Sequence, residues 1–155
     1  MTDVRGKLAE LGIELPAVVA PLASYLPAVR AGDLVFTAGQ LPIVNGALVA
    51  TGKVGAEVSI EDAAWHARTC ALNALAAVDD VVGIETVRRV VKLVGFVASA
   101  PGFTNQPQVV NGASNVLGQI FGDAGRHARS AVGVAELPRN APVEVELIVE
   151  VGGAG

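Results

Sequence analysis

Residues 127–144 read HARSAVGVAELPRNAPVE, and this segment is the most informative feature of the chain. Arg129 opens an otherwise apolar strand, a turn follows at Leu137-Pro138, and Glu144 lies in the strand that runs back. A guanidinium at a strand end, with a carboxylate within reach, would clamp a small carboxylic acid and position a water for attack. A plain surface hairpin has the same pattern, so the rest of the chain must decide between the two interpretations.

Two long helices are expected before this segment. The first runs from Ile60 to about Val82, because Ser59 is a favourable N-cap and small apolar residues recur every three or four positions. Cys70 falls on that alanine-lined face and is expected to be a core residue. The second helix runs from about Gln106 to Phe121 and ends at a glycine, Gly122 or Gly125.

Short apolar runs between turn residues predict the strands. A short helix capped by Thr2 and running to about Leu11 comes first, and a proline-punctuated connection, Pro16–Pro27, follows it. The asparagine–glycine pair at residues 45 and 46 is a hairpin signal that would pair residues 47–49 with the first strand. The expected strands are Leu34–Thr37, Ala47–Val49, Thr86–Ala98 as a central strand, about Arg129–Glu136, and Pro142–Val151.

This order of elements indicates an α/β (α+β) fold with one mixed sheet and two main helices on one face, plus the short N-terminal helix. We expect a single domain over residues 1–155, with residues 1–19 as an N-terminal extension. No helix remains to cover the second face of the sheet. That face is therefore either exposed to solvent or packed against other copies of the chain.

Composition narrows the classes of function. Hydrophobic residues make up 52% of the chain, the net charge is −4, and no block of lysine and arginine occurs. These features argue against a nucleic-acid partner, although a local patch of Arg126, Arg129 and Arg139 stays open. The start of the chain, Met1-Thr2-Asp3, has neither a basic region nor an apolar run, which predicts a cytoplasmic protein without a membrane partner. With a single cysteine and no Cys/His cluster, we expect no metal site.

The last strand separates two kinds of glutamate. Glu146 and Glu150 share a face that is expected to be solvated, whereas Glu144 sits just after the turn, near the strand that begins at Arg129. His127 is the obvious acid–base candidate by residue type, although a solvated loop histidine fits the same pattern. His66, inside the long helix, is expected to be structural.

The run AGDLVFTAGQLP at residues 31–42, the strand at residues 90–92 and the motif Arg129…Leu137-Pro138…Val143-Glu144 together resemble the RidA/YjgF family. That family includes the enamine/imine deaminases, and its members are often labelled L-PSP endoribonucleases. The resemblance covers about residues 20–151 and the chain looks like a longer, divergent subgroup. It implies a chorismate-mutase-like fold, a homotrimer with sites between subunits, and no cofactor.

The resemblance also implies a set of site residues. Arg129 matches the family's carboxylate-binding arginine, Glu144 its site glutamate and Tyr25 its site tyrosine. The family's helix asparagine corresponds to Asn115 or to Asn111. His127 stands where the family usually has proline, and Ala38 replaces the usual serine.

The function that the resemblance implies is hydrolytic deamination of small reactive enamine or imine acids of the 2-aminoacrylate type, giving 2-keto acids and ammonia. Its partner would be a small carboxylate substrate. Two alternatives remain: a non-catalytic trimeric module that binds small carboxylates, and an endoribonuclease. The acidic balance of the chain counts against the last of these.

Overall fold

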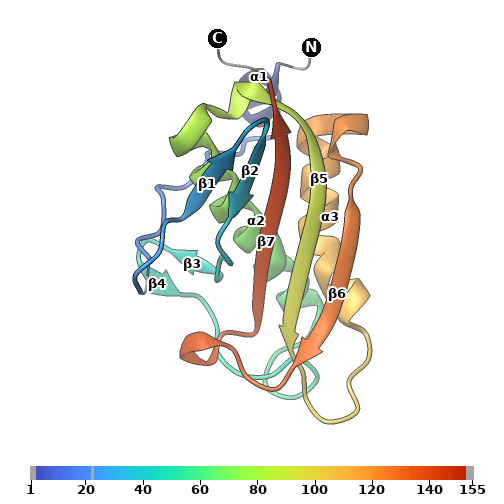
Figure 1. Cartoon of the computed structure of the whole chain (residues 1–155). Helices are drawn as coiled ribbons and strands as arrows, with labels where there is room; N and C mark the ends of the chain where they lie inside the picture. Colours follow the sequence, from blue (N-terminus) through green and yellow to red (C-terminus); the bar gives the residue numbers. More distant parts are fainter. Residues whose placement is uncertain (1–2, 22, 153–155) are drawn as a thin grey trace.

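The computed structural model describes residues 3–21 and 23–152 as one five-stranded mixed sheet with helices on one face (Figure 1). In chain order the elements are α1 (Val4–Glu10), β1 (Ala28–Ala31), β2 (Leu34–Thr37), β3 (Ile43–Val44), β4 (Ala47–Leu48), α2 (Ile60–Val82), η1 (Ile84–Thr86), β5 (Val87–Ala98), α3 (Gln106–Phe121), η2 (Gly122–Gly125), β6 (Ala128–Val134), η3 (Pro138–Asn140) and β7 (Val143–Val151). The predicted α/β fold class and both main helices are confirmed.

The strand order in the large sheet is β1-β2-β7-β5-β6. Every neighbouring pair is antiparallel except β5 and β6, which are parallel. The predicted strand is confirmed over residues 87–98 as an interior strand, since β5 lies between β7 and β6, whereas Thr86 belongs to η1. The segment of residues 127–144 is therefore not a surface hairpin. Its two strands do run in opposite directions, but β5 separates them.

The asparagine–glycine turn does mark a hairpin, but the predicted partner is wrong. Residues 47 and 48 pair with β3 in a separate two-stranded sheet and not with β2. Asn45 and Gly46 have φ values of 52° and 79°, and such a two-residue turn joins the residues that flank it directly. The true hairpin partner of β2 is β1, a strand that the sequence analysis did not identify.

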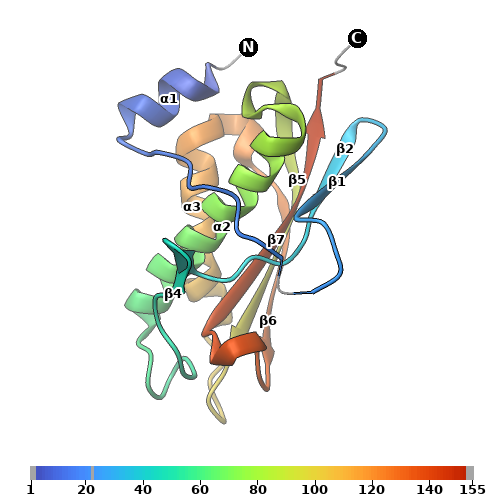
Figure 2. The ribbon, with the colours of Figure 1, turned by 90° about the vertical axis from the view of Figure 1, so that its left-hand side faces the viewer.

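Helices α2 and α3 lie side by side on the same face of the sheet (Figures 1 and 2). The Ser59 hydroxyl caps α2 by accepting a hydrogen bond from the amide of Asp62 at 3.1 Å. Cys70 is fully buried on the alanine-lined face of α2, as predicted, and burial raises the pKa of its thiol well above the usual range. Gly112 of α3 lies against the Ala64 carbonyl of α2, where a Cβ would collide with that backbone. None of the helices within residues 3–21 and 23–152 is long and apolar enough to cross a membrane.

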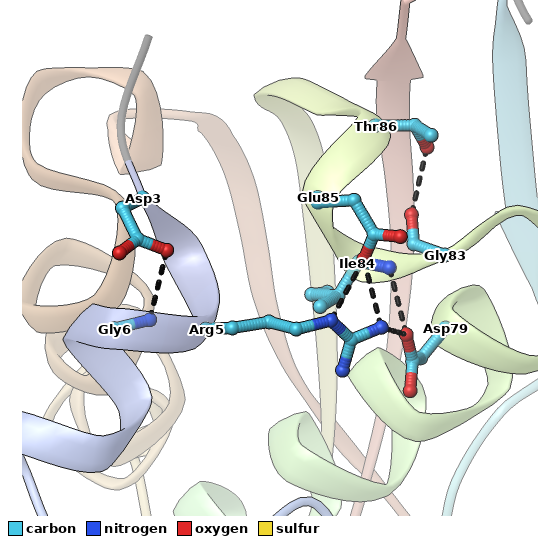
Figure 3. A network of polar contacts seen from close by, with 8 residues as sticks. All are labelled: Asp3, Arg5, Gly6, Asp79, Gly83, Ile84, Glu85 and Thr86. Atoms are coloured by element: carbon cyan, nitrogen blue, oxygen red, sulfur yellow. Dashed lines mark hydrogen bonds and ion pairs between the residues drawn. The ribbon is translucent and has the colours of Figure 1, made fainter.

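The short helix α1 is fixed to the rest of the fold by an arginine (Figure 3). Arg5 donates from Nη2 to Asp79 at 2.7 Å and from Nε to Glu85 at 2.9 Å, at the turn from α2 into β5. The predicted cap residue, Thr2, lies outside the described residues. The side chain of Asp3 caps α1 instead, by accepting a hydrogen bond from the Gly6 amide at 2.9 Å.

The two faces of the sheet differ sharply. Along β7 the residues alternate strictly between buried and half-buried, and the buried set faces α2 and α3. The opposite face is not covered by a helix of the described chain (Figure 2). It carries exposed apolar side chains, among them Val29, Phe36 and Val132, which are 50%, 40% and 43% exposed. We call this surface the open face.

Candidate functional site

Arg129 lies near the start of the edge strand β6, opposite Leu93 of β5. Because Leu93 is fully buried under the helices, its parallel neighbour Arg129 points to the same, helix-covered face. The guanidinium reaches α3, and its two terminal nitrogens, Nη1 and Nη2, donate hydrogen bonds there. Nη1 donates to Asn111 Oδ1 at 2.7 Å and to Ser114 Oγ at 3.2 Å, and Nη2 donates to the Pro107 carbonyl at 3.4 Å.

The structure distinguishes between the two candidate asparagines. Asn111 bonds to Arg129 directly, and Ser114, three residues later, lies on the same side of α3. Asn115 is exposed and makes no hydrogen bond to Arg129. The Nε group of Arg129 has no hydrogen-bond partner within residues 3–21 and 23–152. The edge formed by Nε and Nη2 is therefore the part of the guanidinium best placed to take a bidentate carboxylate.

His127 is half-buried and fixed by two hydrogen bonds, which a freely solvated loop residue would lack. Its Nδ1 lies 2.6 Å from the carbonyl oxygen of Gly125, and its Nε2 lies 2.9 Å from Ser114 Oγ. A carbonyl oxygen can only accept, so Nδ1 carries a proton. We call Asn111, Ser114, His127 and Arg129 the arginine cluster.

Glu144 occupies a different place. It lies on β7 opposite Phe96 of β5, among the half-buried residues of the strand, and therefore on the open face. Partial burial raises the pKa of Glu144 from its usual range, and repulsion from Glu146 on the same strand adds to the effect. Its carboxylate lies against Gly39, where a side chain at that position would collide with it.

Tyr25 borders the same region as Glu144. It is 46% exposed and lines a shallow hollow with Gly39 and Gln40. Gly39 thus lines the hollow beside Tyr25 and also contacts the carboxylate of Glu144. We call Tyr25, Gly39 and Glu144 the glutamate cluster.

The two clusters do not meet in one chain. Arg129 is level with Leu93 and Glu144 with Phe96, so they are three residues apart along β5, about 10 Å, and on opposite faces of the sheet. The expectation that Glu144 lies within reach of Arg129 is therefore wrong within a single chain. The cause is the position of β5 between the two strands that the turn connects.

The sequence analysis missed Ser114, which contacts both Arg129 and His127. A signal for it was present, because Asn111 and Ser114 are three residues apart on a predicted helix and must share a face. The carbonyl of Gly125 could not have been found in this way. Its role depends on how η2 leads the chain from α3 into β6.

Residues 5–151 match the family described as "YjgF/chorismate mutase-like, putative endoribonuclease". The chain belongs to this family. The resemblance seen in the sequence motifs is thereby confirmed, together with the chorismate-mutase-like fold.

Two proteins and one crystal structure are similar to this YjgF-family chain over most of its length. Protein TCP17 of Trypanosoma cruzi is 44% identical over 149 residues, which are 95% of this chain and 93% of the relative. The 2-iminobutanoate/2-iminopropanoate deaminase of Dermatophagoides farinae is 33% identical over 138 residues, covering 88% and 93%. A crystal structure from Agrobacterium tumefaciens has a TM-score of 0.88 and 45% identity, and covers 96% of this chain and 92% of that one.

Proposed function

We propose that this protein hydrolyses small 2-imino acids, formed from enamines of the 2-aminoacrylate type, to 2-keto acids and ammonia. One observation carries the proposal: Arg129 is fixed at its Nη1 end by Asn111 and Ser114, whereas its Nε has no hydrogen-bond partner among the described residues and Nη2 makes only a long contact, 3.4 Å, to the Pro107 carbonyl. An anchored guanidinium with an open edge suits the carboxylate of a small acid. The deaminase relative at 33% identity supports the same substrate class.

The glutamate cluster would complete the site from a second copy of the chain. Because Arg129 and Glu144 face opposite sides of the sheet, one chain cannot use both on one substrate. Packing the open face of one copy against the β6 edge of the next would cover apolar residues and bring Glu144 of one copy toward Arg129 of the other. We therefore propose a homotrimer with sites between subunits, in a cytoplasmic protein.

The chemistry then needs only water. Arg129 holds the carboxylate, and Glu144 of the neighbouring copy takes a proton from a water whose oxygen bonds to the imine carbon. Glu144, whose raised pKa favours holding that proton, returns it to the nitrogen. The carbon then carries a hydroxyl and an amino group. Glu144 passes the hydroxyl proton to the nitrogen as the carbon–nitrogen bond breaks, which releases ammonia and leaves the carbonyl of the keto acid. Positioning of the two reactants supplies much of the acceleration.

The test is release of ammonia and keto acid from imines generated in situ by an amino-acid oxidase. We expect Arg129→Ala to lower kcat/KM by about 100-fold or more, because losing a charge-assisted bidentate contact costs about 3 kcal/mol. Arg126→Ala is the matched control, since the Arg126 side chain is 87% exposed and should leave the rate unchanged.

A folded Arg129→Ala protein that retains wild-type activity would contradict the assignment of the site. If wild type itself accelerates no imine, while calorimetry shows that it binds 2-keto acids and that Arg129→Ala abolishes this binding, the protein is the non-catalytic binding module instead.

A further inference from the structure

The arginine cluster contains a hydrogen-bonded chain that carboxylate binding does not require. Gly125 accepts from His127 Nδ1 at 2.6 Å, and His127 Nε2 lies 2.9 Å from Ser114 Oγ. Arg129 Nη1 donates to the same Oγ at 3.2 Å. An arginine alone would hold a small acid, so the serine–histidine pair calls for its own explanation.

The direction of each hydrogen bond follows from the donors and acceptors available. The Gly125 carbonyl can only accept, so Nδ1 of His127 is protonated, and in the neutral ring Nε2 presents a lone pair. The hydroxyl of Ser114 therefore donates to Nε2 and accepts from the guanidinium. The histidine is oriented to remove the hydroxyl proton, and the cation beside Oγ stabilises the negative charge that forms there.

We propose that Ser114 is a nucleophile toward acyl groups, with His127 as its general base and Gly125 as the group that orients the base. A nucleophile within hydrogen-bond reach of a base, which is itself oriented by a third group, is the arrangement that activates serine in unrelated folds. The three groups come from one stretch of chain: Ser114 from α3, Gly125 from η2, and His127 from the residues just before β6. Ser114 and His127 are half-buried, so neither residue is enclosed in the core.

The substrate class is a small ester that also carries a free carboxylate. The free edge of Arg129 would bind that carboxylate, which brings the ester carbonyl next to Ser114. Oγ then bonds to the carbonyl carbon as its proton moves to Nε2, and the guanidinium lies close to the developing oxyanion. The carbon–oxygen bond to the alcohol breaks, and Nε2 protonates the leaving oxygen. Attack by water in the same manner frees the acid and restores Ser114.

The test uses a fluorophosphonate, which forms a covalent adduct with an activated serine and involves no imine chemistry. We expect intact-mass analysis of the full chain to show one adduct, which peptide mapping places on Ser114. His127→Asn should slow labelling by about 100-fold or more, which is the contribution expected of a general base. Ser114→Ala should abolish it.

Matched controls separate activation from ordinary folding effects. Ser130 lies on the same strand as Arg129 but points to the open face, and His66 lies on α2, so Ser130→Ala and His66→Asn should label like wild type. With an ester assay, the mono-p-nitrophenyl ester of succinic acid should react faster than p-nitrophenyl acetate, and Arg129→Met should remove that preference.

The proposal is overturned if the folded wild-type protein gives no adduct on Ser114. It is also overturned if His127→Asn is labelled at the wild-type rate. Either result leaves the deaminase proposal untouched, because that depends on Arg129 and on a second copy of the chain.

Discussion

Glu144 shows how much one residue depends on its surroundings. It lies half-buried on the open face, and both desolvation and the neighbouring Glu146 disfavour its charged form. The raised pKa has a consequence for stability as well as for proton transfer, because the folded state holds this proton more tightly than the unfolded chain does.

The Glu144→Gln variant shows whether Glu144 makes the free energy of unfolding rise or fall with pH. Between the ordinary value of 4.5 and the raised pKa, the folded protein binds more protons, so wild-type stability falls as pH rises. Glutamine does not titrate. We therefore expect the free energy of unfolding of wild type, minus that of the variant, to decrease from pH 4 towards pH 7 in urea titrations. A difference that stays constant with pH would contradict the raised pKa.

His127 and Ser114 illustrate what residue type alone can and cannot predict. The sequence identified His127 as an acid–base candidate by residue type, but it favoured a solvated loop residue over a catalytic one. Only the placement of α3 beside β6 brings Ser114 within 2.9 Å of it. Activation of the serine is thus a property of two elements in contact and not of a local motif.

At the scale of elements, the packing of α3 on α2 depends on one glycine. A Cβ at Gly112 would collide with the carbonyl of Ala64, which is backbone and cannot rotate away. Gly118 on the same helix has open space around the corresponding position. The two glycines therefore form a matched pair within α3.

Alanine substitutions at these two positions should have opposite effects. Gly112→Ala forces the helices apart and should lower the free energy of unfolding by about 2 kcal/mol or more. Gly118→Ala should raise it by about 0.5–1 kcal/mol, because alanine is the better helix former. Urea denaturation of both variants measures this contrast, and equal effects would contradict the close approach at Gly112.

For the whole molecule, the open face is the feature that points beyond a single chain. A sheet face with exposed residues such as Phe36 and Val132 is costly to leave in water. The mean hydropathy of +0.51 agrees with a chain that carries apolar surface on this face.

Disrupting the open face should dissociate the proposed homotrimer. We expect light scattering to give wild type about three times the chain mass of 15.7 kDa, and Phe36→Asp a monomer, because a buried carboxylate without a partner is unfavourable. Val81→Asp is the control, since Val81 is 42% exposed on α2, away from the open face. A monomeric wild type would remove the basis for intersubunit sites.

The sequence by itself determined the features that depend on near neighbours along the chain. Residues 60–82 and 106–121 form the predicted helices, because caps and three-to-four spacing act within a few residues. The buried alternation of residues 143–151 and the candidacy of Arg129 were also available from the sequence. Tertiary structure alone decided which strands are neighbours and which face each side chain takes. It placed β5 between Arg129 and Glu144, and Ser114 beside His127, because these contacts join segments whose pairing no local pattern specifies.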